Sequence, residues 1–457
     1  MTKAQHVVEH IPETVGYMPV SSYLWHFIND RPIKLKLVTA SGEETGQVIS
    51  VPAWAVQGEQ RLYKVGLDLG NNGPKAAMYD EQGRTVVAHL QAVVKTVQDL
   101  AAGDMGTVFE EMIQQPKARD QKEMPQRGDA QAEVEDISLG REWVDSLAIE
   151  HDGVSLSKGT TRARVSDPRY PRFLMYAVAH LFQKAGYKPG DYDLLLAVGM
   201  PNEEMVETAH GAQLDPETQA ALTGALCGKR WRIRITDREG TSAQFNLKIA
   251  DLAPGPQSYA AFYAWQFKPD GQPAQTDIQE ITLEDMGAND LHELFIRLKF
   301  IPSTVNGKEQ FKVTITATRE RKGDGIILAI MQPFAKRLKK VYGLGELDDA
   351  VAQQAFFQKE ITVGGFREDL SPLVASVTSE EGAKVITDVF KGPRRPRSFY
   401  MIEGGGNVLL RPDLVDKLTS LNRTARTYLL FGAQHANVAN AVGLLSILDQ
   451  VTRYGHV

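Results

Sequence analysis

Three turns in the sequence contain glycine directly after an apolar segment, and two of them also carry an aspartate. They are Asp68-Leu69-Gly70-Asn71-Asn72-Gly73-Pro74-Lys75, Asp285-Met286-Gly287-Ala288-Asn289-Asp290 and Gly404-Gly405-Gly406-Asn407. Backbone N–H groups exposed in such turns can hold phosphate oxygens, and an aspartate beside them can hold a hydrated Mg²⁺. Magnesium is typically bound by one or two carboxylates together with substrate phosphates. Two opposed turns that each carry an aspartate are therefore expected to hold a triphosphate from both sides.

Simpler interpretations of the same residues stay open. A glycine in a turn often only provides a backbone with positive φ, which other residues adopt with difficulty. Lys75 follows Asp68 by seven residues and is either a solvated hairpin lysine or a point charge for a phosphate. Its place beside the first turn favours phosphate contact.

Several other kinds of active site are excluded by what the sequence lacks. The ten histidines are scattered without an HExxH motif, and there is neither a GxSxG motif nor a GxxxxGK motif followed by Ser or Thr. These absences argue against a catalytic metalloenzyme, an α/β-hydrolase and a P-loop nucleotidase. The single cysteine, Cys227, excludes an intramolecular disulfide and a multi-cysteine zinc site, and is interpreted as a small hydrophobic residue at a helix end.

Composition and charge limit the expected partners. The 457 residues are 42% hydrophobic and 24% charged, which is typical of a globular chain of about three domains. The net charge of −6 and the isoelectric point of about 6.0 give no overall attraction to nucleic acid or to an anionic membrane. No apolar run is long enough to span a membrane, and the polar N-terminus does not resemble a secretion signal, so a cytoplasmic location is expected. The basic stretch 391–397 is more typical of a solvated loop than of a DNA contact.

The first half of the chain is expected to contain an extension, a meander and an excursion. Apolar alternation at 33–38 and 47–51 predicts a β-hairpin within residues 1–60. Residues 115–135 carry almost no large apolar side chain and mix both charges, which predicts a solvated or disordered excursion. The remaining segments are predicted as strands at 63–67, 75–79 and 85–90, a helix at 171–185, and a buried strand at 194–199.

The second half begins with a further hairpin and then becomes largely helical. Apolar alternation at 278–283 and 294–300 predicts two strands joined by a turn at 284–290. The segments that follow are predicted as helices at 326–342, 347–358 and 379–390, a strand at 398–402, a helix from about 412, a strand at 427–431 and a helix at about 436–451. Meanders with interspersed helices indicate an α/β chain of two related lobes.

The order of these motifs along residues 62–450 resembles the actin-like ATPases, and within them the bacterial plasmid-segregation (ParM-like) and archaeal actin branch. LDLGNNGPK resembles the first phosphate loop of that family, LLLAVGMPNEEM the segment that ends a strand beneath the nucleotide, and LEDMGAND the second phosphate hairpin. FYMIEGGGNVLL resembles the adenosine loop, and AQHANVANAVGLL resembles the closing helix with its Asn-Ala-x-Gly core. Each motif is short, so the resemblance depends on their common order.

The resemblance implies an α/β chain with the actin-like two-lobed fold, in which two RNase H-like α/β domains enclose a nucleotide cleft and an N-terminal β extension precedes them. The implied boundaries are residues 1–60 for the extension, 61–200 for lobe I, 201–435 for lobe II, and 436–457 for a C-terminal helix that returns to lobe I.

The resemblance also implies roles for individual residues. Asp68 and Asp285 would position Mg²⁺, through water, and the water that attacks the nucleotide. The residues implied to face the nucleotide are Gly70, Asn71, Asn72, Gly73, Lys75, Gly287, Ala288, Asn289, Gly404, Gly405, Gly406 and Asn407. Glu204 falls where the family places the residue that orients the attacking water, and Glu203 and Glu207 compete for that role. The alternative for Glu204 is a solvated glutamate at a helix N-terminus.

Three residues depart from the family's pattern. The second phosphate hairpin of the family usually has another glycine and threonines, whereas Ala288 and Asp290 occur here. The methyl group of Ala288 is expected to hold the backbone farther from the β-phosphate, and Asp290 to add a negative charge there. Pro74 removes one N–H donor from the first loop. We therefore expect slow hydrolysis.

The implied function is a filament-forming ATPase that polymerises head to tail in a nucleotide-dependent way. It would use ATP, or GTP, with Mg²⁺, and would serve plasmid or DNA segregation through a DNA-binding adaptor protein, without direct contact to nucleic acid or membrane. Two alternatives remain. One is a non-polymerising small-molecule kinase of the same superfamily, for which no convincing acceptor-side aspartate is found. The other is a nucleotide-binding scaffold with a degenerate site, motivated by Ala288 and Asp290.

Overall fold

The computed structural model describes residues 32–38, 44–52, 62–70, 73–97, 129–134, 137–150, 153–156, 159–201, 204–208, 211–236, 241–267, 272–288, 290–305, 308–347, 349–391, 398–421, 428–431, 436 and 438–454. Four residues named above, Asn71, Asn72, Glu203 and Asn289, lie outside the described residues, as do residues 115–128 of the expected excursion. Within the described part of the chain, no helix is both long and apolar enough to cross a membrane.

The first of two large sheets has ten strands. From one edge to the other they are β5 (Thr85–His89), β4 (Lys75–Tyr79), β3 (Leu62–Asp68), β10 (Gly190–Met200), β14 (Ser242–Pro256), β13 (Arg230–Thr236), β7 (Asp129–Val134), β8 (Ile137–Val144), β6 (Val93–Val97) and β9 (Val154–Ser155). The central strands β3, β10 and β14 run parallel, and the remaining neighbours are antiparallel. β10 is buried from Leu194 to Met200, as its apolar run predicts.

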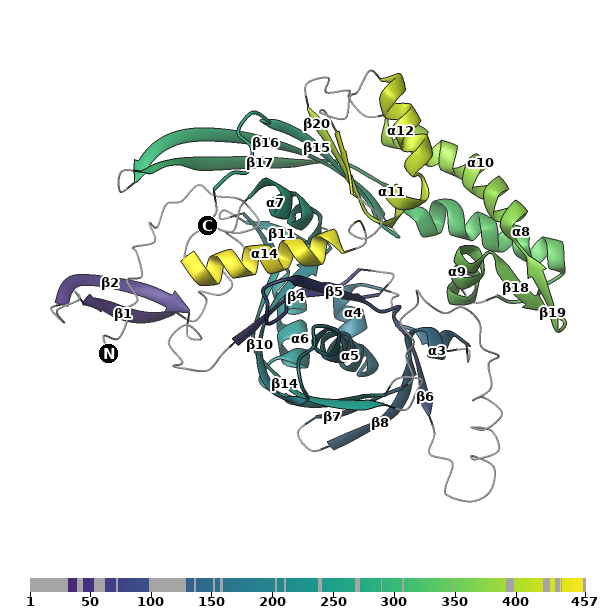
Figure 1. Cartoon of the computed structure of the whole chain (residues 1–457), viewed down its shortest axis with the longest axis horizontal. Coiled ribbons are helices and arrows are strands. Elements are labelled where there is room, and N and C mark those ends of the chain that lie inside the picture. The colour runs from purple at the N-terminus through teal and green to yellow at the C-terminus, as the bar shows by residue number, and fades with distance from the viewer. Residues whose placement is uncertain are drawn as a thin grey trace.

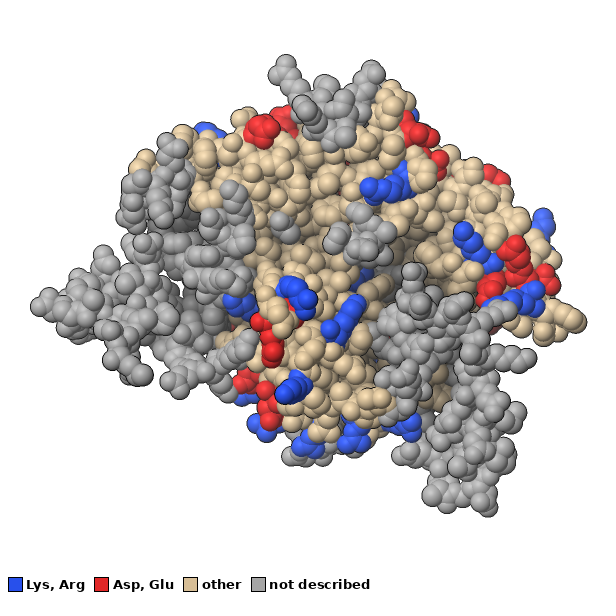
Figure 2. Space-filling view, in the orientation of Figure 1, with Lys and Arg blue, Asp and Glu red and all other residues tan. Residues whose placement is uncertain are grey.

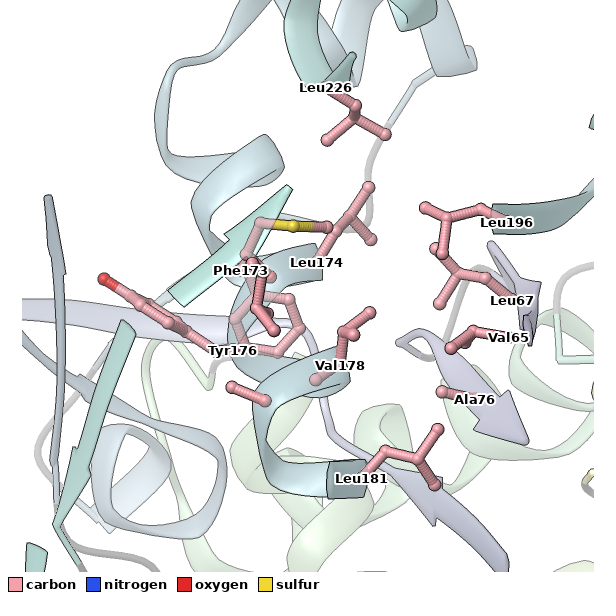
Figure 3. Packing of buried hydrophobic residues seen from close by; sticks show 14 of the residues in the cluster. Val65, Leu67, Ala76, Phe173, Leu174, Tyr176, Val178, Leu181, Leu196 and Leu226 are labelled. Atoms are coloured by element: carbon pink, nitrogen blue, oxygen red, sulfur yellow. The ribbon is translucent and has the colours of Figure 1, made fainter. Parts of the chain in front are cut away.

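Helix α5 (Arg169–Lys184) packs against this sheet. Its apolar residues recur at helical spacing, and Leu174, Val178 and Leu181 are fully buried. Figure 3 shows them directed toward Val65 and Leu67 of β3 and toward Leu196 of β10. The shorter helices of this lobe are α3 (Asp145–Glu150), α4 (Thr161–Ser166) and α6 (Pro216–Leu226).

The second large sheet has five strands and is covered by helices of the C-terminal half. Its order is β17 (Lys308–Asp324), β16 (Asp290–Val305), β15 (Glu280–Met286), β20 (Phe399–Glu403) and β21 (Tyr428–Leu430). β15, β20 and β21 run parallel. The helical segments are a π-helical turn (Ile327–Met331), α8 (Gln332–Tyr342), α9 (Asp349–Gln358), α10 (Ser371–Val389), α11 (Gly405–Leu409) and α12 (Arg411–Ser420), with a small hairpin of β18 (Glu360–Val363) and β19 (Phe366–Asp369).

Helix α14 (Ala439–Tyr454) lies between the two sheets, as Figure 1 shows in yellow. Two glycines allow its close approach. A Cβ on Gly66 of β3 would overlap the carbonyl oxygen of Ala441, and a Cβ on Gly443 would overlap the carbonyl oxygen of Ala260 in α7 (Ala260–Gln266). Leu444, fully buried, extends the core of the second sheet. The C-terminal helix therefore joins both halves of the molecule.

Most of the predicted elements are present. The N-terminal hairpin is formed by β1 (Pro32–Val38) and β2 (Glu44–Pro52), which pair antiparallel. The helix predicted at 326–342 begins with the π-helical turn, and the helix predicted at 379–390 begins at Ser371. Cys227 forms the C-terminal cap of α6, as expected for a helix end.

Two expectations are corrected. Residues 129–134, predicted as part of an excursion, form β7, in which Ala130 and Ala132 are fully buried in the first sheet. β13 and β14 also pair within that sheet, so it extends well beyond residue 200, where lobe I was expected to end. Short connecting elements complete the chain, namely β11 (Met205–Thr208), β12 (Gly211–Leu214) and the 3₁₀ turn Gln257–Tyr259.

Candidate functional site

The two aspartates singled out in the sequence lie at the carboxyl ends of parallel strands in the two sheets. Asp68 ends β3 and is in register with Gly199 of β10, while Asp285 lies one residue before the end of β15 and is in register with Glu403 of β20. Asp68 is 2% exposed and Asp285 6%. The charge of Asp68 contributes to the raised pKa of Asp285, so the two carboxyl groups lie within electrostatic range of each other. The fold therefore brings these two strand ends together.

Lys75 neutralises part of this negative charge. Its Nζ lies 3.5 Å from Asp68 Oδ2, because the first residue of β4 is in register with the last residue of β3. A Cβ on Gly70 would overlap the Lys75 ammonium group, so glycine at this position leaves the space that the ammonium occupies. The first turn thus places an ammonium group and a buried carboxylate side by side.

A third carboxyl group, Glu403, completes the group of acids. It is 1% exposed, and burial together with the charges of Asp285 and Asp68 raises its pKa well above the ordinary range. Burial raises the pKa of Asp285 to about 7, and it raises the pKa of Asp68 more than Lys75 and Arg164 lower it. Glu403 directly follows the strand predicted at 398–402 and was not predicted as a site residue. The signal that could have found it is an acidic residue between an apolar strand and three glycines.

The residues of this group fit a cation held through water. Asp68 Oδ1 and both carboxyl oxygens of Glu403 are buried and have no hydrogen-bond partner among the described residues. Buried oxygens of this kind are costly unless a proton, a cation or water satisfies them. No group of three or more His, Cys, Asp or Glu side chains in the described part of the chain is arranged to hold a metal ion directly. A hydrated Mg²⁺ that is also held by phosphates does not require such a group.

Asn440 extends the site from helix α14. Its side chain hydrogen-bonds to Asp285 and lowers the pKa of that carboxyl group, against the larger effect of burial. Asn440 is 7% exposed and belongs to the segment that resembles a closing helix. The helix that joins the two sheets therefore also contacts the acidic group.

The second turn is shorter than the sequence indicates. The expected turn at 284–290 is wrong at both ends, because β15 continues to Met286 and β16 begins at Asp290. The carbonyl oxygen of Gly287 accepts from Ile326 N at 3.1 Å, and that of Ala288 accepts from Ile327 N at 2.6 Å. The turn is thereby fixed to the helical segment that follows β17. The negative charge of Asp290, which departs from the family's pattern in this turn, also raises the pKa of Asp285.

At three positions of the first and third turns, backbone conformation or close packing requires glycine, and no ligand is needed to explain it. Gly73 has φ +108°, and a Cβ there would overlap the carbonyl oxygen of Leu90. Gly404 has φ +83°, and a Cβ there would overlap the carbonyl oxygen of Met286. A Cβ on Gly406 would lie 2.9 Å from Met286 Cβ. The third turn is therefore packed directly beneath the second one, at the start of α11. Gly405 lies between these two packed glycines as the first residue of that helix.

Asn407 and Glu204 are both fixed by hydrogen bonds. Asn407 is fully buried and its Nδ2 donates to the carbonyl oxygen of Phe431 at 2.6 Å, which ties the third turn to the end of β21. Glu204 Oε1 accepts from Thr161 N at 2.7 Å, while its Oε2 is buried without a hydrogen-bond partner among the described residues. Glu204 is thus held at the start of α4 rather than solvated. The side chain of its competitor Glu207 is not described.

Comparisons of the whole structure identify the fold. An archaeal actin homologue superposes with a TM-score of 0.53 at 15% identity, covering 85% of this chain and 100% of that chain. The subunit of a 15-stranded ParM filament from Clostridium botulinum gives a TM-score of 0.56 at 16% identity, covering 86% and 100%. The chain has the actin-like fold. ParM from Bacillus thuringiensis with ADP, at 12% identity and a TM-score of 0.50, covers 85% of this chain and 99% of its own.

The actin-like fold confirms what the order of motifs implies about architecture. No family model and no curated protein sequence matches this chain. The likeness is therefore one of structure, at sequence identities of 12–16%.

Proposed function

We propose that this protein is an actin-like ATPase that binds a nucleoside triphosphate with Mg²⁺ between its two lobes and assembles with its own copies into filaments. The observation that carries the proposal is the meeting of Asp68 and Asp285 at the ends of parallel strands from two sheets of an actin-like fold, with Lys75 beside Asp68. The archaeal actin homologue and the ParM proteins share this fold, and one ParM structure contains ADP.

Different residues of the site would bind different parts of the nucleotide. Lys75 would contact phosphate as a point charge, and the backbone of the first and second turns, from Gly70 and Gly287 onward, would donate N–H groups to phosphate oxygens. Asp68 and Asp285 would hold Mg²⁺ through water. A metal ion held there would supply positive charge that offsets the charge of the phosphates. The third turn, with Gly404, Gly405, Gly406 and Asn407, would face the adenosine.

Hydrolysis would need little covalent chemistry from the protein. A water oxygen bonds to the terminal phosphorus as the bond to the bridging oxygen breaks, which releases inorganic phosphate and a nucleoside diphosphate. Glu204 Oε2, which has no hydrogen-bond partner among the described residues, would orient this water. Ala288 and Asp290 would slow the reaction, because Asp290 adds a negative charge close to Asp285.

The likeness to ParM supports the proposed assembly and cellular role. The C. botulinum protein was solved as a filament, and a quadruple mutant of the related pCBH ParM is described as non-polymerisable. A head-to-tail interface that does not close by rotation gives an open filament, and closure of the lobes around nucleotide can bias such an interface. We propose plasmid or DNA segregation through an adaptor protein. In Figure 2, acidic and basic side chains are interspersed over the visible described surface, which suits an adaptor better than direct DNA binding.

A scaffold with a degenerate nucleotide site is the alternative that one observation favours. Three acidic side chains, Asp285, Asp290 and Glu403, surround the place where phosphates would lie, and their charges oppose an anionic ligand. Such a protein would bind nucleotide weakly and release no phosphate.

The experiment that separates these functions measures nucleotide binding and phosphate release by the same preparation. The wild-type protein is expected to bind ATP with Mg²⁺ and to release phosphate slowly. The Asp285→Ala variant is expected to retain binding and to stop phosphate release, because it loses a carboxylate that positions metal and water. Failure of the wild-type protein to release phosphate would contradict the ATPase function and support the scaffold.

A further inference from the structure

Arg164 is a buried arginine that contacts the first turn from helix α4. It is 3% exposed, and its Nη1 donates to the carbonyl oxygen of Leu69 at 3.0 Å and to the Tyr170 hydroxyl at 3.3 Å. Its Nη2 donates to Thr161 Oγ1 at 3.1 Å. Arg164 was not predicted as a site residue, because a lone arginine in the segment TRARVS carries no motif.

The contact with Leu69 fixes the backbone of the first turn. Leu69 lies between Asp68, at the end of β3, and Gly70, over which the Lys75 ammonium group lies. Its N–H donates to the carbonyl oxygen of Gly199 in β10 at 3.4 Å, while its own carbonyl oxygen accepts from Arg164. A guanidinium group presents its donors in a rigid planar fork. The position of the turn is thus set from both sides, by the sheet and by α4.

The same guanidinium group is connected to Glu204 by hydrogen bonds through Thr161. Thr161 is fully buried, accepts from Arg164 through its hydroxyl oxygen, and donates its N–H to Glu204 Oε1 at 2.7 Å. Hydrogen bonds therefore connect the Leu69 carbonyl group, Arg164, Thr161 and Glu204 in one continuous series. At the far end of the series, Glu204 Oε2 is buried and has no hydrogen-bond partner among the described residues.

Charge is consistent with this arrangement. Burial raises the pKa of Asp68, and the charge of Arg164 offsets part of this rise. Burial also raises the pKa of Tyr170, which Arg164 contacts, and the charges of Asp68 and Glu204 add to that rise. The guanidinium group thus lies within electrostatic range of the carboxylate of the first turn, and the Tyr170 ring lies within range of both carboxylates. A buried cation in such a place fixes the geometry of its surroundings, because moving it away from its acceptors would leave it unsatisfied.

We propose that Arg164 is a positioning residue for hydrolysis, which sets the distance between the first turn and the unpartnered oxygen of Glu204 and so places the attacking water relative to the terminal phosphate. The inference rests on the proposed nucleotide hydrolysis and adds a residue that acts through Glu204 without touching the nucleotide. A purely structural role, in which Arg164 only attaches α4 to the sheet, predicts different kinetics.

The test begins with Arg164→Lys, which keeps the positive charge and removes the planar guanidinium group with its several N–H donors. We expect kcat for ATP to fall about 10- to 100-fold, as misplacement of reacting groups by about 1 Å does, while the Kd for nucleotide changes less than about threefold. Arg162→Lys is the matched control. Arg162 lies on the same helix but is exposed and pairs with Glu217, so kcat should stay at the wild-type value.

A double-mutant cycle separates positioning from structure. If Arg164 acts through Glu204, then Arg164→Lys should cause little further loss of single-turnover rate in a Glu204→Gln background. Thr161→Val, which removes only the hydroxyl acceptor, guards against misfolding of the arginine variant and should also lower kcat without changing the nucleotide Kd.

Three results would overturn the inference. The first is a wild-type kcat in either Arg164→Lys or Thr161→Val. The second is a loss of single-turnover rate on Arg164→Lys that is as large in the Glu204→Gln background as in wild type. The third is a rise in the nucleotide Kd that accounts for the whole loss of rate. A wild-type protein that neither binds nor hydrolyses ATP would instead overturn the proposed function itself, so the two failures are distinguishable.

Discussion

Asp68, Asp285 and Glu403 are buried within electrostatic range of one another, and burial raises the pKa of each. Lys75 offsets only part of their charge. In the absence of ligand, the protein therefore holds several acidic groups whose ionisation is unfavourable. A bound cation would relieve this repulsion, so the acidic group favours a site that takes Mg²⁺ together with nucleotide.

Removal of one of these acids should stabilise the protein without ligand. The pKa of Glu403 is raised in the folded state, so the folded protein holds this proton more tightly than the unfolded chain does. Stability is then lost as pH rises above the unfolded value of about 4.5 toward the folded value. Glu403→Gln removes that loss and should raise Tm by about 2 °C or more near neutral pH.

Thermal unfolding without nucleotide or Mg²⁺ checks this expectation. The gain in Tm of Glu403→Gln over wild type should grow between about pH 5 and about pH 8. Glu81→Gln, at an exposed turn of the first sheet, is the control and should show no such gain. A gain that is equal at both pH values would contradict a buried, ionising Glu403.

Replacement of Lys75 should weaken the binding of triphosphate. Hydrogen bonds between charged groups contribute about 1.5–3 kcal/mol, so Lys75→Met should raise the Kd for ATP about 10- to 100-fold. Titration with a fluorescent ATP analogue measures this change. Lys384→Met is the surface control, since Lys384 is exposed and pairs with Glu381 in α10. Equal affinity in Lys75→Met and wild type would remove Lys75 from the phosphate site.

At the scale of elements, helix α14 and the strand ends together determine where the site lies. α14 approaches β3 at Gly66 and α7 at Gly443, and in the same region Asn440 contacts Asp285. A displacement of this helix would therefore alter both the packing between the sheets and the acidic group.

A methyl group added at Gly443 should test the close packing of α14 against α7. Gly443→Ala places a Cβ onto the Ala260 backbone, and overpacking of this kind costs about 1–3 kcal/mol of unfolding free energy. Gly224→Ala in α6 is the matched control. A Cβ there meets no atom within 4 Å, so this change should be neutral or slightly stabilising. Denaturant unfolding of both variants measures the difference, and equal stabilities would contradict the close contact.

The sequence predicted elements that carry strong apolar patterns and missed those that depend on tertiary packing. β10 and α5 are readily predicted because their large apolar residues recur at the period of a buried strand or of a helix. β7 was missed because its buried residues are alanines among polar neighbours, so only its partners β13 and β8 make it a strand.

The residues of the candidate site also fall into those that a local sequence pattern predicts and those that it does not. Asp68, Lys75 and Asp285 were predicted because they stand in glycine-bearing turns after apolar strands. Glu403 and Arg164 were not, because their importance arises from contacts with residues distant in the chain, Asp285 and Leu69. No local pattern records those contacts.

In the whole molecule, helix α14 lies between two sheets whose strand ends face each other, and the chain shares its fold with the archaeal actin homologue and with ParM. A ligand held from both sides by the first and second turns would fix the relative position of the lobes. If the proposed filament interface depends on that position, nucleotide state would control assembly.

The most direct test of this account is assembly of the purified full-length chain with Mg²⁺. Light scattering and negative-stain electron microscopy would compare ATP, GTP, ADP and no nucleotide. We predict filaments that form with triphosphate, remain absent without nucleotide, and disassemble as phosphate is released. Particles that stay small in every condition, or filaments that ignore nucleotide, would contradict it.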